Sequence, residues 1–157
     1  MLSNRFGYSA ENCSVHRTLD IVGEKWSLLV LREAFYGVRR FEDFARALGC
    51  PRNILSRRLK TLVDHDILQR EAYQELGRRP RAEYRLTPKG RELFPALVAL
   101  MLWGDRWAAD PAGPPIVITH NHCGDGVTMT MSCASGHNPL TVRDVNFSPG
   151  PGAKRLA

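Results

Sequence analysis

Five polar side chains at helical spacing carry the most distinctive chemistry of this sequence. They are Arg52, Asn53, Ser56, Arg57 and Lys60. Four aliphatic residues form the opposite side of a helix predicted over residues 51–65: Leu55, Leu59, Leu62 and Val63. Arginine pairs well with guanine, asparagine with adenine and serine with either base, while arginine and lysine also neutralise phosphates. The polar face therefore suits the major groove of double-stranded DNA; the alternative is a solvated basic face.

A basic hairpin is predicted to follow this helix. Residues 68–73 and 82–86 have the pattern of strands, and residues 75–80 are rich in turn formers. The arginines of the hairpin are Arg78, Arg79 and Arg81. A hairpin in this place can reach a flanking groove or the phosphate backbone, as a wing does. Arg81 has a second interpretation, because it could form a structural ion pair with Glu83.

The surrounding elements are predicted to hold the polar helix against a core. Phe41, Phe44, Ala45 and Leu48 recur at i, i+3, i+4 and i+7 and indicate a short amphipathic helix. Gly49 ends that helix, and Pro51 suits the first turn of the next. Residues 26–35 form the expected central helix, residues 13–23 a shorter one, and residues 87–107 a long one. Two short helices with a tight break, the second basic outside, predict a helix-turn-helix.

The positive charge is concentrated in the same region. The 157-residue chain has a formal net charge of +6. Residues 39–85 hold 12 lysines and arginines against 7 aspartates and glutamates, whereas residues 1–38 and 108–157 are each balanced. A basic middle with neutral flanks favours a polyanionic partner. Single-stranded nucleic acid is less well matched, because residues 51–65 contain no aromatic side chain for stacking.

Four stretches occur in the order typical of one known family. They are spread over residues Cys13 to Trp107, which make up about three-fifths of the chain. They are Gly23–Trp26, Arg39–Phe44, Leu55–Leu62 and, most specifically, Pro80–Leu93. In these stretches the chain resembles the HxlR family of bacterial winged-helix regulators. The resemblance implies a homodimer, formed through the N-terminal and long C-terminal helices, that binds a pseudo-palindromic operator. One departure is Asp66, where many relatives have glycine; aspartate tolerates a left-handed backbone better than most residues do.

The resemblance also suggests a role for one of the cysteines. Cys13 stands at the expected start of the first helix, where a thiolate is favoured, and some relatives sense oxidants or electrophiles near this position. The alternative for Cys13 is packing at the dimer interface. Cys50 is expected to be a packing residue. The spread of the four cysteines does not resemble a disulfide scaffold.

The C-terminal region contains a pattern that resembles a degenerate zinc site. His120 and Cys123 form one pair, Cys133 and His137 form a second, and His122 is a further candidate ligand. Two such pairs could bind zinc tetrahedrally. The spacing departs from a zinc ribbon, because Gly136 stands where the second Cys-x-x-Cys would end. The alternative is an ordinary hairpin that retains polar side chains.

The predicted architecture is mainly α with a small β wing, followed by a small β-rich C-terminal extension. Residues 1–12 form an N-terminal arm, 13–107 the winged helix-turn-helix, 108–115 a linker and 116–157 the extension. Strands are expected at residues 116–119 and 127–132. Met101, Trp103 and Trp107 are expected to form the dimer core; the alternative is a ligand pocket between the long helices.

The predicted function is a homodimeric, sequence-specific DNA-binding repressor that responds to a small molecule or a thiol-reactive signal. The expected partners are double-stranded DNA, a second copy and a small-molecule effector, with no membrane. No cofactor is expected apart from the zinc candidate, and the chain is expected to be cytosolic. Nucleotide-binding loops and common hydrolase motifs are absent from the sequence. The alternatives are a redox- or metal-modulated regulator, a metal-dependent enzyme that uses the histidine–cysteine cluster, and a winged helix that binds only protein.

Overall fold

The structure is a computed structural model that describes residues 7–74 and 81–156. The chain divides into two compact units, Cys13–Leu97 and a second one that combines the N-terminal arm with residues from Val98 onward. No helix in the described ranges is long and apolar enough to cross a membrane.

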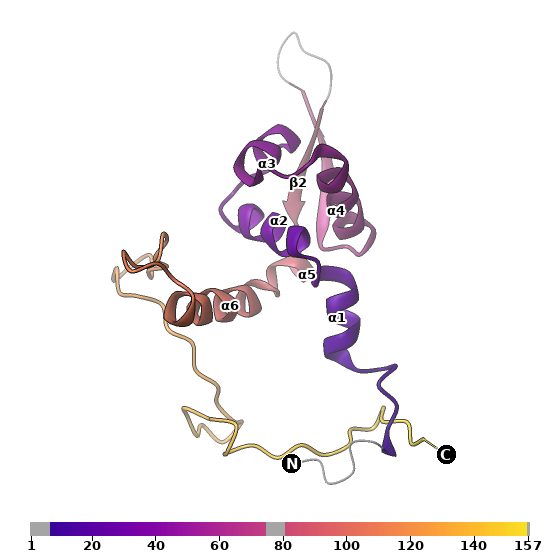
Figure 1. The fold of residues 1–157 in the computed structure, drawn as a ribbon, viewed down its shortest axis with the longest axis vertical. Coiled ribbons are helices and arrows are strands. Elements are labelled where there is room, and N and C mark those ends of the chain that lie inside the picture. Colours follow the sequence, from indigo (N-terminus) through magenta and orange to yellow (C-terminus); the bar gives the residue numbers. More distant parts are fainter. Residues whose placement is uncertain (1–6, 75–80, 157) are drawn as a thin grey trace. The chain divides into compact units, whose positions relative to one another are not determined.

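Four helices build the core of the first unit (Figure 1). They are α1 (Ser14–Val22), α2 (Lys25–Phe35), α3 (Phe41–Leu48) and α4 (Arg52–Asp64). The fully buried side chains come from α2, α3, α4 and the first strand: Val30, Leu31, Phe44, Leu55, Leu59, Leu62 and Leu68. The amphipathic patterns of α3 and α4 are thereby confirmed. Gly49 ends α3 in a left-handed conformation with φ of 57°, and Pro51 caps α4 from just outside rather than occupying its first turn.

The predicted wing is an antiparallel pair of strands, β1 (Leu68–Tyr73) and β2 (Arg81–Leu86). They pair residue for residue, from Leu68 opposite Leu86 to Tyr73 opposite Arg81. The segment before α3 joins this ribbon through an isolated bridge between Arg40 and Glu83. The middle of the wing is thus hydrogen-bonded to the segment before α3, so the wing and the helix-turn-helix are held together.

A buried junction follows the wing. Thr87 caps the short helix α5 (Pro88–Arg91), because its hydroxyl oxygen accepts a hydrogen bond from the Gly90 N–H at 2.9 Å. The same hydroxyl donates to the Asp66 carbonyl oxygen at 2.7 Å. The expected cap is confirmed, and Asp66 is left-handed with φ of 56°, as the sequence suggested.

The prediction of a single helix over residues 87–107 is wrong. It is broken into α5 and α6 (Phe94–Trp107), with Glu92 as the C-cap of α5. The physical reason is Pro95, which has no N–H to donate to the carbonyl oxygen one turn earlier and whose ring crowds that turn. Leu93 still packs against the core.

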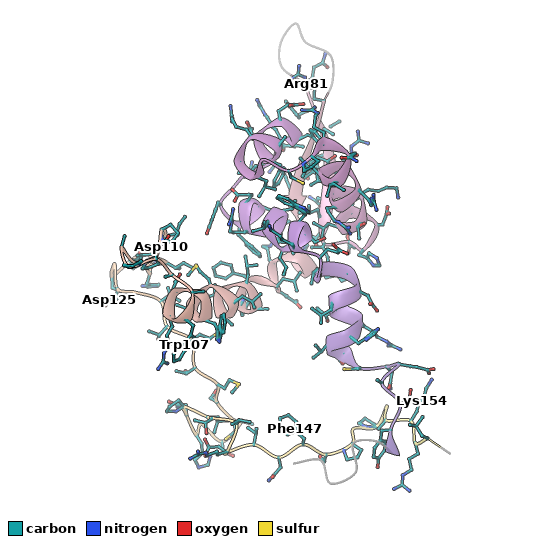
Figure 2. All side chains as sticks on the ribbon, viewed as in Figure 1. Arg81, Trp107, Asp110, Asp125, Phe147 and Lys154 are labelled. Carbon is teal, nitrogen blue, oxygen red and sulfur yellow. The ribbon has the colours of Figure 1, made fainter. Side chains whose placement is uncertain are left out.

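The second unit lacks the strands expected at residues 116–119 and 127–132. Its pairing in the described residues is limited to isolated bridges, Thr119 with Gly126 and Tyr8 with Arg155. Side chains from residue 108 to 156 stand largely in solvent, and none of them is buried (Figure 2). Without an apolar face to cover, an extended segment gains little from forming a sheet.

Candidate nucleic-acid interface

Helix α4 presents two chemically distinct faces. Leu55, Leu59 and Leu62 have no exposed surface. The five polar residues predicted for DNA contact are all exposed: Arg52, Asn53, Ser56, Arg57 and Lys60. One stripe therefore fixes the helix on the core while the other faces outward, an arrangement that fits insertion into a major groove.

The first residue of α4 is held by α3. Arg52 donates two hydrogen bonds to the Glu42 carboxylate, at 2.8 and 2.6 Å, and stacks 4.9 Å from the centre of the Phe41 ring. The Arg52 hydrogen bond is the main reason that the pKa of Glu42 lies below its usual value. The pair joins the two helices across their turn. Arg52 is therefore partly engaged in positioning α4, a role that its sequence position does not reveal.

An ion pair also connects two residues near the C-terminal end of α4. Lys60 forms an ion pair with Asp64 one turn later, with the atoms 2.5 Å apart. Both side chains are mostly exposed, so this pair adds little stability. Asn53, Ser56 and Arg57 lie between the two braced ends of the polar face.

Arg58 anchors the inner side of α4. Its guanidinium lies 3.4 Å from the Glu24 carboxylate, and its side chain is only 17% exposed. The Arg58 Nε and the Ser27 hydroxyl are buried without a hydrogen-bond partner in the described residues. Arg58 thus connects α4 to the start of α2 and does not belong to the outward face.

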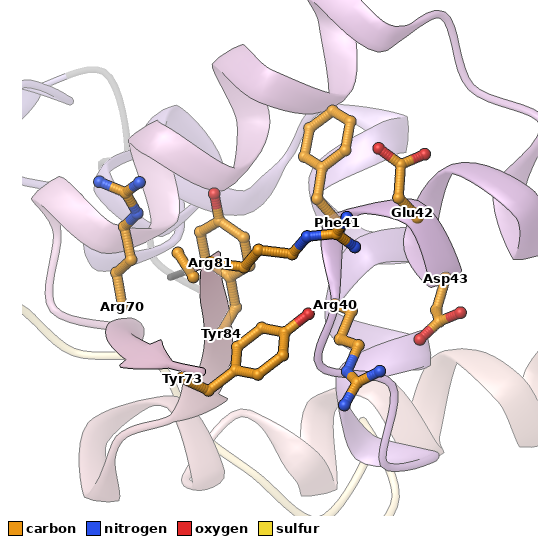
Figure 3. Close-up of a pocket in the computed structure, with 9 residues that line it drawn as sticks. Arg40, Phe41, Glu42, Asp43, Arg70, Tyr73, Arg81 and Tyr84 are labelled. Carbon is orange, nitrogen blue, oxygen red and sulfur yellow. The ribbon is translucent and has the colours of Figure 1, made fainter. Parts of the chain in front are cut away.

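The wing contributes a basic hollow beside α3. Arg78 and Arg79 lie outside the described residues. Arg81 lines a hollow of about 650 Å³ together with Arg40, Arg70 and Tyr73 (Figure 3). Two carboxylates also line it, and each is paired with another arginine: Glu42 with Arg52 and Asp43 with Arg46. The Arg40 guanidinium stacks 4.6 Å from the centre of the Tyr73 ring. Three guanidinium groups around one hollow suit the phosphates of a DNA backbone.

The structure does not support the alternative pairing of Arg81 with Glu83. Glu83 instead accepts a hydrogen bond from Arg85 at 2.6 Å, and Arg85 also pairs with Glu71 on the neighbouring strand. Side chains two apart on one strand share a face, so Arg81 and Arg85 both had access to Glu83. The cross-strand Glu71 favours Arg85, because Arg85 then bridges two carboxylates.

Sequence reasoning missed Arg40 and Arg70 as members of this surface. Arg70 lies two residues after the buried Leu68 on β1 and is nevertheless exposed, so strand alternation gave no signal for it. Arg40 precedes α3 and reaches the hollow only because its segment pairs with β2. That pairing joins residues about forty positions apart and has no local signature.

The two cysteines of the first unit differ in environment. Cys13 is the N-cap residue of α1 and is exposed, as expected from its position. Cys50 is 5% exposed, and its burial raises the pKa of the thiol. Cys50 packs in the core and is thus poorly suited to a sensing role.

The four candidate zinc ligands occur as two close pairs. The Nδ1 atom of His120 lies 3.2 Å from the Sγ atom of Cys123, and the Sγ atom of Cys133 lies 3.2 Å from the Nδ1 atom of His137. No cluster of three or more potential ligands occurs within residues 7–74 and 81–156. The structure therefore forms the two halves of the predicted site and does not join them.

Known proteins resemble this chain over nearly its whole length or over about 60% of it. An uncharacterised HTH-type transcriptional regulator of Mycobacterium tuberculosis is 48% identical over 153 residues, which are 98% of this chain and 93% of the relative. A similar regulator of Synechocystis is 43% identical over 96 residues, 60% of this chain and 70% of the relative.

Among solved structures, PA1607, a candidate transcription factor, has a TM-score of 0.78 and 36% identity, with 89% of this chain and 96% of that one covered. The redox regulator HypR in its reduced form has a TM-score of 0.53 and 32% identity, over 59% of this chain and 90% of its own. The second unit therefore has counterparts in the longer relatives.

The family model described as HxlR-like helix-turn-helix matches residues 21–111, more than half of the chain. This match includes α2, α3, the outward face of α4 and the wing. The chain belongs to the HxlR-like helix-turn-helix family of transcriptional regulators.

Proposed function

We propose that this regulator is a homodimeric repressor that binds a pseudo-palindromic operator through α4 and the wing. The observation that carries the proposal is the division of α4, whose leucines are buried while its polar residues face outward. Asn53, Ser56 and Arg57 are the best placed to contact base edges. Arg40, Arg70 and Arg81 are assigned to phosphates, because their hollow flanks α3.

The decisive measurement is fluorescence anisotropy with a duplex from upstream of the gene and a scrambled duplex of equal length, each at several salt concentrations. Selective binding with a steep salt dependence is expected. Asn53→Ala should cost about 1–3 kcal/mol on the operator and little on the scrambled duplex. Arg70→Ala should weaken both complexes and lower the salt slope by about one.

Arg143→Ala is the matched control for the arginine variant, because Arg143 is an exposed arginine of the second unit. Its binding should equal that of the unmodified chain. If the upstream duplex is not bound, selection from genomic fragments supplies the operator. Failure to enrich any fragment, with the fold intact by circular dichroism, would refute the proposal.

Dimer formation is supported by uncovered apolar side chains on two helices. On α1, Val15 and Leu19 are exposed one turn apart. On α6, Trp103 and Trp107 are 63% and 65% exposed, again one turn apart. Large apolar side chains left uncovered on a helix often mark an interface. Trp103→Arg should yield monomers in sedimentation velocity, whereas Val142→Arg, at an exposed valine of the second unit, should leave the dimer unchanged.

A thiol response is assigned to Cys13. It is exposed at the start of α1, next to the helix proposed for the dimer interface. HypR, whose solved structure is similar to this chain, is a redox regulator. Diamide or a quinone should release DNA from the unmodified chain and not from Cys13→Ser. An equal response of both proteins would remove Cys13 from the mechanism and leave DNA binding intact.

A further inference from the structure

Two exposed turns of the second unit each hold a histidine and a cysteine at chelating distance. The nitrogen and sulfur atoms are 3.2 Å apart in the His120–Cys123 pair and 3.2 Å apart in the Cys133–His137 pair. A tetrahedral zinc ion with normal bond lengths separates a nitrogen and a sulfur ligand by about 3.5 Å. Each pair is therefore close to the spacing that a metal chelate needs, before any metal is bound.

The backbone of the first turn fixes this spacing. The Gly124 N–H donates to the His120 carbonyl oxygen at 2.8 Å, which closes the chain between the two ligands. Gly124 is left-handed with φ of 78°, a conformation that side chains disfavour. The turn therefore brings its histidine and cysteine together through the backbone.

The second turn is also closed by a backbone hydrogen bond at a left-handed glycine. The Gly136 N–H donates to the Cys133 carbonyl oxygen at 2.9 Å, and Gly136 is left-handed with φ of 84°. The Cys133 N–H donates in turn to the His137 carbonyl oxygen at 3.1 Å, so the backbone also ties the two ligands of this pair to each other.

The two turns are tethered closely along the chain. The Val127 N–H donates to Ile118 across the first turn, and the Leu140 N–H donates to Met131 across the second. Only residues 128–130 lie between these hydrogen-bonded hairpins. The four backbone steps from Val127 to Met131 span at most about 14 Å when extended, and Cys123 and Cys133 are ten residues apart in the chain. The two pairs consequently have a high effective concentration for one another.

The described residues that follow α6 form no core that would order this region. No side chain from residue 108 to 156 is buried, and apolar residues such as Met131, Val142 and Phe147 are more than half exposed. Ordering a backbone costs entropy, which small domains without a core offset through a metal or a disulfide. Cys123 and Cys133 form no disulfide in the structure.

We propose that the second unit binds one zinc ion through His120, Cys123, Cys133 and His137. Two thiolates and two imidazoles form the soft, tetrahedral ligand set that selects zinc among common divalent ions. No three of these ligands lie together in the described part of the chain. Binding therefore closes one hairpin onto the other and supplies the cross-link that this unit lacks. The site is separate from α4 and the wing, so it does not depend on the proposed operator binding.

The test uses the untagged full chain, reconstituted with zinc chloride, dialysed and analysed by mass spectrometry for bound metal. One zinc per chain is expected, and both Cys123→Ser and Cys133→Ser should lose it. Two matched controls should retain it: His122→Ala, adjacent to the site, and Cys13→Ser, an exposed cysteine outside it. Less than one zinc per chain, or retention by both cysteine variants, would overturn the proposal.

Cobalt substitution tests the site in the unmodified chain, so its result does not depend on whether the variants fold. A visible spectrum typical of a tetrahedral, thiolate-bound ion is expected, together with slower tryptic cleavage at Arg143 in the loaded protein. An octahedral spectrum, or a disulfide between Cys123 and Cys133 in protein kept under reducing conditions, would exclude the site. Far-UV circular dichroism of the helices should be the same with and without metal.

Discussion

Replacing Gly90 with alanine should damage the junction between the wing and α5 severely. A Cβ atom at this position would lie 2.1 Å from the Ile67 carbonyl oxygen, whereas real Cβ contacts are not found under 3.0 Å, so the two backbones must separate by about 0.9 Å. That shift would lengthen beyond bonding range the two hydrogen bonds that cross this junction, from the Thr87 hydroxyl to the Asp66 carbonyl oxygen and from the Thr87 N–H to the Ile67 carbonyl oxygen. Two buried hydrogen bonds at about 1 kcal/mol each and an overpacking term of about 1–3 kcal/mol give a loss of roughly 3–5 kcal/mol.

Urea unfolding followed by circular dichroism, at one protein concentration because of the proposed dimer, measures this loss. Gly37→Ala is the matched control. Gly37 has φ of 89° and nothing within 4 Å of an added Cβ, so only backbone strain of about 1–2 kcal/mol is expected there. If Gly90→Ala proved no less stable than Gly37→Ala, the steric reasoning would fail.

Two further results follow from shifted pKa values. Because Arg52 lowers the pKa of Glu42, the pair stabilises the fold above the unfolded pKa and loses its effect as the pH falls through the folded one. Glu42→Gln should therefore lower the urea midpoint slightly at neutral pH and not below about pH 3; a constant difference would contradict this. In metal-free protein, iodoacetamide should modify Cys133, whose pKa is lowered by the His137 N–H, much faster than Cys50, whose pKa is raised by burial. Peptide mass spectrometry measures both rates, and equal rates would count against these environments.

The sequence was most informative where function and folding depend on local periodicity. The division of α4 could be predicted because leucine and polar residues alternate at helical spacing, and the left-handed Asp66 because a turn must follow the helix. The break before α6 was also predictable in principle, since Pro95 marks it.

Other features could not be predicted, because they depend on tertiary contacts. Arg52 has several carboxylates nearby in sequence, and only the packing of α3 on α4 selects Glu42. Arg40 joins the basic hollow through a bridge to Glu83. The strands predicted after residue 115 do not form, because tertiary contacts are lacking there. A strand-like pattern without a partner surface is not enough to form a sheet.

Because β1 and β2 pair regularly, the wing can be lengthened at its distal end without a change in the rest of the first unit. Their residue-for-residue register has no bulge from Leu68 to Tyr73, and the middle of the ribbon is fixed by the bridge between Glu83 and Arg40. Inserting two residues into each strand at the distal end would keep every side chain on its present face. Each insertion would extend the ribbon by about 7 Å, which is close to two base-pair steps along a duplex. Under the proposed mode of operator binding, such insertions would change the spacing between the wing contact and the α4 contact without altering the residues assigned to the bases.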